Sequence, residues 1–370
     1  MKQFFFKSIL GLSVALIVSL TSCTSRNTPV DTSKMEREPI DYELITDSLY
    51  TSAPGSFIYT GRYVVWADIV RSFNAFEGNF IHVVDPELKK EVASMGRQGN
   101  GPNEYTDPSE RRYNGDTIYV YDLNKPRQVL ISLTDAVEGR KPFIPLAPPR
   151  DTWEGAKLFI TKESQVHCNP DYRDTPFRYI NGTDTIPFGQ YVFDPGIDND
   201  MFRMNFLQMS IEYDADLEML VCKAGYFPYV ALYKKTGNSF ELMTEIKEDF
   251  DYKVSGGGWI DFSRRGFFTC TLTKNYFVTL DYDYDHGEQP SQGGEMSKRP
   301  STLFVRDHNG NLLRIFKLDE PTLSLTGCGK DNILYAIIAP QDPDRDESAS
   351  EYELVRIDLE KAMSGKKSAL

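Results

Sequence analysis

A recurring β-hairpin is the feature that most limits what this chain of 370 residues can fold into. Each copy has an alternating apolar strand, a turn rich in Asp, Asn, Gly or Lys, and a second strand, which is the sequence pattern of a hairpin. A further β-rich stretch comes before most copies, so one unit holds about four strands. Six copies of the hairpin begin at Asn79, Asp116, Phe177, Tyr229, Thr302 and Tyr352.

The spacing of these copies predicts a ring. They recur about every 55 residues, slightly above the roughly 40–50 residues of a four-stranded propeller blade. Helix-like composition is confined to residues 358–369. Many short strands without alternating helices form a sandwich array or a propeller, and repetition at one period favours the propeller, whose ring leaves only short edges. We therefore predict an all-β fold, a single six-bladed β-propeller of four-stranded antiparallel blades, over residues 41–370.

The charge balance excludes one class of partner. Asp and Glu number 54 against 41 Lys and Arg, which gives a formal net charge of -13. A protein that wraps a nucleic-acid backbone needs clustered cations to neutralise phosphates. We therefore expect no nucleic-acid partner.

The N-terminal residues 1–22 have the pattern of an export signal. Lys2 and Lys7 provide a positive start, and residues 9–20 are an apolar run. That run is too short for a spanning helix, which needs about 20 apolar residues, so it is typical of a signal h-region.

The signal ends in a motif that resembles the bacterial lipobox. Its residues are Leu20-Thr21-Ser22-Cys23, and a lipobox supplies the thiol that takes a diacylglycerol. The resemblance implies that Cys23 becomes the first residue and carries a thioether diacylglycerol and an amide-linked acyl chain, which together anchor a protein firmly to a membrane. An ordinary secretory signal with a chance Cys is the alternative.

Residues 23–40 are polar and contain two prolines, and we expect a lipidated N-terminus followed by a flexible tether. In Bacteroidetes lipoproteins, acidic residues soon after the Cys typically signal surface export. Residues 24–27 contain none. This favours a lipid-anchored protein that faces the periplasm, with surface display as the alternative.

Residues 96–105, GRQGNGPNEY, follow the first hairpin. They resemble the G-x-x-G-x-G-P-G-E-[FY] signature of TolB-like six-bladed propeller lipoproteins of Bacteroidetes, a family related in shape to NHL-type propellers. The resemblance implies a fold and a cell-envelope compartment but no catalytic residue. The sequence departs from the signature at Asn103, and Asn also tolerates a left-handed backbone. The matching residues, apart from the final aromatic, are Gly96, Gly99, Gly101, Pro102 and Glu104.

Taken by itself, this motif could be a phosphate-binding loop, but no helix opens after it and no Lys-Ser/Thr pair follows. We predict instead a structural turn whose glycines allow a positive φ. Arg97 and Glu104 either pair across this turn or point into the central funnel.

The longest gap between hairpins contains the candidate binding residues. Asp281, Asp283 and Asp285 alternate with two tyrosines, so on a strand the three acids share one face. That face is either an ordinary solvent-exposed edge or a cation or sugar-hydroxyl site in the channel. Trp259 follows a Gly-rich run and either caps the core or covers a sugar ring in a rim loop.

We expect no metal or cofactor beyond the lipid. Asp342, Asp344 and Asp346 have the spacing of calcium-loop ligands, but Glu347 stands where such a loop needs Gly, so a solvated hairpin tip is favoured over calcium. Four further cysteines are either disulfide-bonded or buried as free thiols. They are Cys168, Cys222, Cys270 and Cys328.

The sequence contains no G-x-S-x-G or H-E-x-x-H motif. We therefore expect a binding or protein-interaction module with a protein or glycan ligand. The alternative is a carbohydrate-active lyase or hydrolase that uses carboxylates from different blades in the central funnel, because such pairs leave no local motif.

Overall fold

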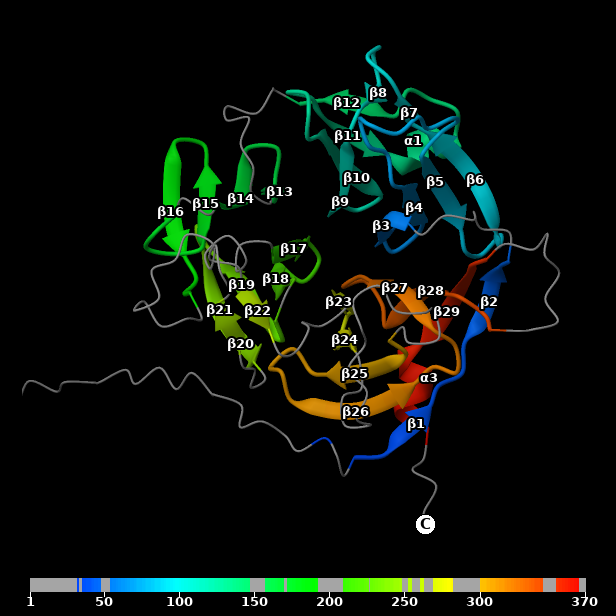
Figure 1. The fold of residues 1–370 in the computed structure, drawn as a ribbon, viewed down its shortest axis with the longest axis vertical. Helices are drawn as coiled ribbons and strands as arrows, with labels where there is room; N and C mark the ends of the chain where they lie inside the picture. Colours follow the sequence, from blue (N-terminus) through cyan, green and yellow to red (C-terminus); the bar gives the residue numbers. More distant parts are fainter. Residues whose placement is uncertain are drawn as a thin grey trace, which may run out of the picture.

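The computed structural model describes residues 32, 35–47, 54–146, 157–169, 172–191, 209–225, 227–247, 252–254, 260–262, 269–281, 300–341 and 351–365. They form six sheets around a central axis, which confirms the six-bladed β-propeller (Figure 1). Within each blade the chain moves outward from the axis through successive antiparallel strands.

The first three blades each consist of four consecutive strands. Blade 1 contains β3 (Pro54–Tyr59), β4 (Val64–Asp68), β5 (Ile81–Asp85) and β6 (Lys90–Met95). Blade 2 contains β9 (Pro108–Asn114), β10 (Thr117–Asp122), β11 (Gln128–Ser132) and β12 (Phe143–Pro145). Blade 3 contains β13 (Lys157–Phe159), β14 (Ser164–Cys168), β15 (Phe177–Asn181) and β16 (Asp184–Phe188).

The other three blades complete the ring. Blade 4 contains β17 (Met209–Asp214), β18 (Met219–Ala224), β19 (Tyr229–Thr236) and β20 (Ser239–Lys247). Blade 5 contains β23 (Thr269–Leu272), β24 (Phe277–Asp281), β25 (Thr302–Arg306) and β26 (Leu312–Lys317). Blade 6 contains β27 (Thr322–Gly327), β28 (Ile333–Ile338), β29 (Glu353–Asp358) and, from the N-terminal part, β2 (Glu43–Thr46).

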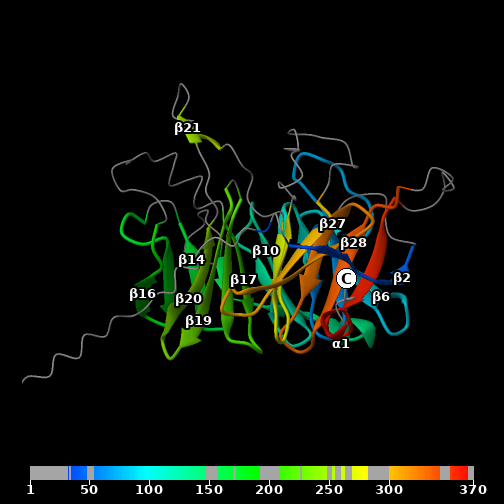
Figure 2. The same ribbon diagram turned by 90° about the horizontal axis from the view of Figure 1, so that it is seen from below.

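The smaller elements connect or extend the blades. Helix α1 (Leu133–Val137) follows β11, and β7 (Arg97–Gln98) pairs in parallel with β8 (Glu104–Tyr105). The hairpin of β21 (Tyr252–Val254) and β22 (Ile260–Phe262) stands out from one face of the disc (Figure 2).

The prediction of a sixth hairpin from Tyr352 is wrong. After β29 the chain enters helix α3 (Leu359–Ser364), because the Asp358 carboxylate accepts the Lys361 backbone N–H at 2.9 Å and caps the helix. The outer strand of blade 6 is β2, which pairs antiparallel with β29, Leu44 opposite Val355. The two ends of the chain therefore close the ring in one sheet.

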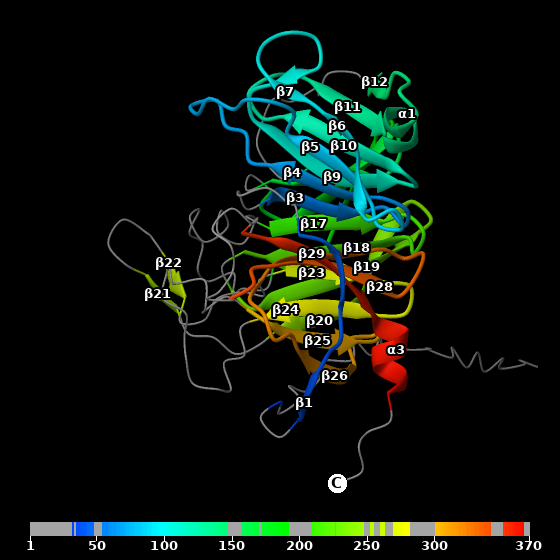
Figure 3. The same cartoon turned by 90° about the vertical axis from the view of Figure 1, so that its right-hand side faces the viewer.

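The chain joins the ring before residue 41. Strand β1 (Arg37–Pro39), at the end of the segment expected to be a tether, pairs in parallel with β26 and adds a fifth strand to blade 5 (Figure 3). Ile40 follows it and is buried among residues of blades 5 and 6. The N-terminal part of the chain thus contacts blades 5 and 6.

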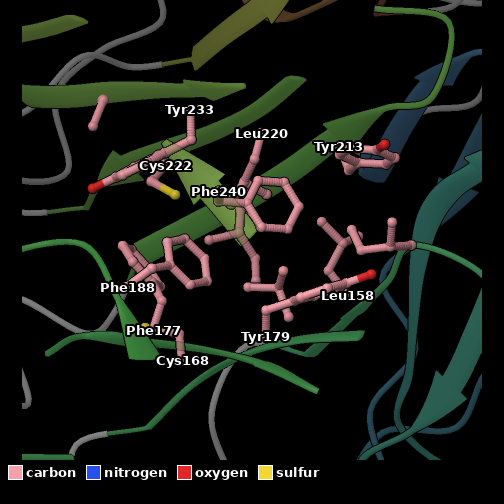
Figure 4. Close-up of a cluster of buried hydrophobic side chains, with 14 of the residues drawn as sticks. Leu158, Cys168, Phe177, Tyr179, Phe188, Tyr213, Leu220, Cys222, Tyr233 and Phe240 are labelled. Atoms are coloured by element: carbon pink, nitrogen blue, oxygen red, sulfur yellow. The ribbon is translucent and has the colours of Figure 1, made fainter. Parts of the chain in front are cut away.

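Apolar side chains between neighbouring blades form the core. Between blades 3 and 4, aromatic rings interlock, with Phe177 edge-on to Tyr233 at 5.9 Å and Phe188 stacked on Phe240 at 5.1 Å (Figure 4). Cys168 and Cys222 lie in this same cluster, and none of the four described cysteines is part of a disulfide bond. Among the described residues, no helix is both long and apolar enough to cross a lipid bilayer.

Candidate functional site

A polar cavity of about 300 Å³ lies between the innermost strands of the ring. Small residues on these strands, such as Gly55, Ser210 and Ser324, leave space where larger side chains would fill the axis. Five acidic and basic side chains also line it. They are Glu110, Arg111 and Arg112 on β9, Glu212 on β17 and Lys223 on β18. This cavity is the candidate site.

Arg112 is one of the residues that line the cavity. Its guanidinium donates to the carbonyl of Gly327 at 2.7 Å, to Asp214 Oδ2 at 2.7 Å and, more weakly, to the carbonyl of Tyr59 at 3.4 Å. It also pairs with Glu212 Oε1 at 3.3 Å. One side chain of blade 2 therefore connects blades 1, 4 and 6, and the neighbouring acids raise the pKa of the guanidinium against the effect of burial.

Both carboxylate oxygens of Asp214 already accept hydrogen bonds. Only 1% of it is exposed, and its carboxylate also accepts the N–H groups of Gly329 at 2.7 Å and Leu217 at 2.9 Å. A Cβ atom at Gly329 would lie 2.6 Å from Asp214 Oδ1 and 2.5 Å from Leu217 Cγ. Residue 329 is therefore Gly because the backbone must approach the carboxylate closely.

Glu110 is the least satisfied group in the cavity wall. It is 3% exposed, and Ser56 Oγ donates to its Oε2 at 2.7 Å across the boundary of blades 1 and 2. Its Oε1 is buried and has no hydrogen-bond partner within the part of the chain that the structure describes. Burial raises the pKa of Glu110, while the hydrogen bond from Ser56 and the charge of Arg111 oppose that effect.

Glu212 and Lys223 line the same cavity. Burial raises the pKa of Glu212, and Arg112 acts in the opposite direction. Burial lowers the pKa of Lys223, and Cys270 and Asp281 of blade 5 act against this. Burial raises the pKa of the Cys270 thiol to about 12, so this thiol is a poor nucleophile at neutral pH.

The residues predicted as rim or funnel ligands lie elsewhere or outside the described residues. Asp281 is the last residue of β24, is 4% exposed, and does not line the cavity. Asp283, Asp285 and Trp259 lie outside the described residues. The same holds for Cys23 and for the aspartates with calcium-loop spacing.

The family-like motif forms a structural turn. Gly96 and Asn103 have φ values of 78° and 59°, and the Gly101 N–H donates to Glu104 Oε2 at 2.6 Å. A Cβ atom at Gly99 would lie 2.2 Å from that same oxygen, so glycine makes room for the carboxylate. Glu104 thus binds within the turn. The two predicted alternatives were a pair between Arg97 and Glu104 and a position of both side chains in the central funnel, and neither describes Glu104. Arg97 is exposed and does not line the cavity.

Blade 2 fastens this turn to the ring. Arg127 donates to the carbonyl of Gly101 at 2.9 Å and also to that of Glu104, and Lys125 Nζ donates to the carbonyl of Gly99 at 2.5 Å. Both cations come from the turn between β10 and β11. The motif therefore joins blades 1 and 2.

The described residues contain no cluster of three or more His, Cys, Asp or Glu side chains that could hold a metal ion. His82 and its two acidic neighbours form a hydrogen-bond network. Its ring nitrogens contact Asp68 Oδ2 at 3.1 Å and Glu91 Oε2 at 3.2 Å within blade 1, and Trp66 Nε1 donates to Asp68 Oδ1. This network links the strands of one blade.

Sequence reasoning missed the cavity residues because no motif connects them. One local signal was present: Glu110, Arg111 and Arg112 are three consecutive charges inside a strand that begins with Pro108. Glu212 and Asp214 alternate on β17 in a similar way. Charges inside an innermost strand have to find partners across the axis.

One comparison with a solved structure supports the fold, and none identifies a family. No family model matches the chain, and a search of curated proteins found no match. A crystal structure of a DUF4221 family member from Bacteroides vulgatus is similar, with a TM-score of 0.51 and 12% identity over 86% of this chain and 94% of that one. The β-propeller domain of Cps50 (Swd1) from Myceliophteria thermophila has a TM-score of 0.41 and 9% identity over 85% of this chain and 99% of that one.

The raised pKa of Glu110 predicts a pH-dependent stability. The folded protein holds this proton more tightly than the unfolded chain, so the contribution is fully present below the ordinary value of 4.5 and is lost as the pH rises through the raised pKa. We expect Glu110→Gln to match the wild type at pH 4 and to be about 1–3 kcal/mol more stable at pH 8. Urea unfolding at both pH values measures this.

Glu241→Gln, at an exposed position of β20, is the matched control and keeps the wild-type pH profile. Parallel profiles of the wild type and Glu110→Gln from pH 4 to pH 8 would contradict the assignment.

Proposed function

We propose that this protein is a lipid-anchored, periplasm-facing binding module whose central cavity takes a small polar ligand. The observation that carries the proposal is Glu110, whose Oε1 is buried in the cavity wall and has no hydrogen-bond partner among the described residues. An unsatisfied buried acceptor costs about 1–3 kcal/mol, and a ligand that donates to it recovers that cost. A cavity of about 300 Å³ suits a small molecule.

Binding explains the cavity better than catalysis does. Asp214 and Arg112 are engaged with each other and with backbone groups of other blades, so neither is available to react. The Cys270 thiol has a pKa of about 12. Glu110 and Arg111 also line the cavity and can offer charge and hydrogen bonds to a ligand.

One observation favours the carbohydrate-active alternative. Glu212 and Asp214 contact the same guanidinium nitrogen of Arg112, at 3.3 and 2.7 Å, so these two carboxylate oxygens lie within about 6 Å of each other. Carboxylate pairs of glycoside hydrolases have roughly that separation. Asp214 is 1% exposed and accepts three hydrogen-bonding groups, however, so it is not available as the second reactive acid of this pair.

The anchor rests on the lipobox-like residues before Cys23 and on the signal that precedes them. Cys23→Ala removes the thiol that takes the diacylglycerol, so we expect the variant to leave the membrane fraction or to stay as an uncleaved precursor in a bacterial host. Ser22→Ala keeps a small residue before the Cys and should be processed normally. Fractionation and the mass of the N-terminal peptide measure both, and a membrane-bound, unlipidated wild type would contradict the anchor.

Binding is tested by thermal unfolding of the full chain in detergent with free amino acids, neutral monosaccharides and uronates. We expect at least one compound to raise Tm in the wild type and to have a much smaller effect on Glu110→Gln. Product analysis with oligosaccharides runs beside it. If the protein turns over an oligosaccharide and Glu212→Gln abolishes this activity, the carbohydrate-active enzyme replaces the binding module. If no compound changes Tm, the cavity is not a binding site.

A further inference from the structure

We propose that the loops at one end of blades 1 and 2 dock onto a phospholipid bilayer, with the side chain of Phe73 inserted below the lipid headgroups. This inference rests on the lipid anchor of the proposed function and adds an orientation to it. It follows from three exposed apolar side chains on loops that hydrogen bonds join to one another. These residues, Ile69, Phe73 and Leu123, are called the apolar tip.

The apolar tip is open to solvent. Phe73 is 80% exposed, more than any other large apolar side chain in the part of the chain that the structure describes, and Ile69 and Leu123 are at least half exposed. Ile69 and Phe73 lie on the loop between β4 and β5, and Leu123 lies in the turn between β10 and β11. Both connections are at the same end of their blades. The loop after β4 projects on the side from which the β21–β22 hairpin stands out (Figure 3).

Gln98 fixes the backbone on both sides of Phe73. Its Nε2 donates to the carbonyls of Arg71 at 2.8 Å and Asn74 at 2.6 Å, and its Oε1 accepts the Phe76 N–H at 2.7 Å. Gln98 belongs to the glycine-rich motif of residues 96–105. A loop that is already ordered loses little conformational entropy when it docks, so the motif prepares Phe73 for binding.

Asp107 joins this loop to the turn that carries Leu123. Its carboxylate pairs with Arg71 at 3.0 Å, and its carbonyl accepts the Leu123 N–H at 2.9 Å. The three apolar side chains are therefore presented on one support. Apolar residues exposed singly need no explanation, whereas several on adjoining loops mark an interaction with a protein or a membrane.

The charge of the three connections favours a bilayer. Anionic lipids give a membrane a negative surface potential, which repels an acidic protein, and this chain has a net charge of -13. Residues 69–80, 96–107 and 122–127 instead contain equal numbers of basic and acidic side chains. The basic residues are Arg71, Arg97, Lys125 and Arg127, and the acidic residues are Glu77, Glu104, Asp107 and Asp122.

Most of these acids are also engaged within the loops. Glu104 accepts the Gly101 N–H, Asp107 pairs with Arg71, and Asp122 accepts both the N–H and the hydroxyl of Thr106. The end of blades 1 and 2 is thus a neutral surface with exposed apolar groups on an acidic protein. Such a surface can approach a bilayer without the repulsion that an acidic surface meets.

The anchor gives this surface enough reach. Arg37, the first residue of β1, comes about 14 residues after Cys23, and a segment of that length can span up to about 50 Å. A strand of average length measures only about 17–20 Å. The lipid on Cys23 therefore allows either end of the blades to face the bilayer, and the apolar tip selects one of them.

The test attaches a fluorescent label to the lipidated full chain in vesicles of phosphatidylethanolamine and phosphatidylglycerol that contain nitroxide-labelled lipids. The labelled variants are Phe73→Cys and Leu123→Cys. The matched control is Leu88→Cys, because Leu88 is 59% exposed in the turn between β5 and β6, at the opposite end of blade 1. The native thiols of the blades react poorly with the label, since burial raises the pKa of each.

We expect the nitroxides to quench the label at positions 73 and 123 and to leave the label at position 88 unchanged, because the apolar tip alone enters the bilayer. A second pair of variants keeps the label on Leu123→Cys. Phe73→Asp should abolish quenching at position 123, since a charge at the tip opposes insertion. Leu88→Asp should leave that quenching unchanged.

The possible failures are distinct. A chain that does not float with the vesicles overturns the lipid anchor and the docking together. A chain that floats while every label stays unquenched keeps the anchor and overturns the docking. Equal quenching at positions 73 and 88 also overturns it, because neither end then faces the lipid. Cross-linking from residue 73 to an envelope protein, without quenching, assigns the apolar tip to a protein partner instead.

Discussion

The buried ion pair of Arg112 and Asp214 is the interaction on which the centre of this propeller depends. The 2.7 Å contact joins blades 2 and 4, and the same guanidinium reaches the carbonyl of Gly327 in blade 6. A buried charge is tolerated only when it is paired and its remaining hydrogen bonds are made. Asp214 meets that condition through the N–H groups of Gly329 and Leu217. These bonds hold the inner strands of blades 2, 4 and 6 together.

This cross-link determines where a site can exist. The innermost strands β9 and β17 contact each other directly although blade 3 lies between their blades in the chain. Arg112 lines the cavity, and small residues on the inner strands leave its space open. Glu110 also lines it, and its Oε1 is buried without a hydrogen-bond partner among the described residues.

Much of the fold was predictable from the sequence, and the reason is local. Five of the six hairpins have alternating strands joined by turn residues, as between β5 and β6 or between β25 and β26. The sixth prediction failed because β29 is followed by a capped helix, and its outer neighbour β2 comes from the other end of the chain. Pairing between distant segments leaves no local pattern.

The site was not predictable for the same reason. Ser56, Glu110 and Lys223 are far apart in the sequence, and only ring closure places them around one cavity. The alternating acids from Asp281 onward form a recognisable sequence pattern because they are close together in the chain. Asp281 proves to be a buried strand end outside the cavity. The role of the glycine-rich motif was predictable, because its glycines make room for a side chain within the same turn.

A double-mutant cycle tests whether Arg112 and Asp214 stabilise the ring as a pair. Free energies of unfolding in urea are compared for the wild type, Arg112→Met, Asp214→Asn and the double variant. Removing one partner leaves the other buried and unpaired, so each single change should cost about 3–5 kcal/mol. The double variant should cost less than their sum by about 2–3 kcal/mol. Additive effects, within about 0.5 kcal/mol, would contradict the account.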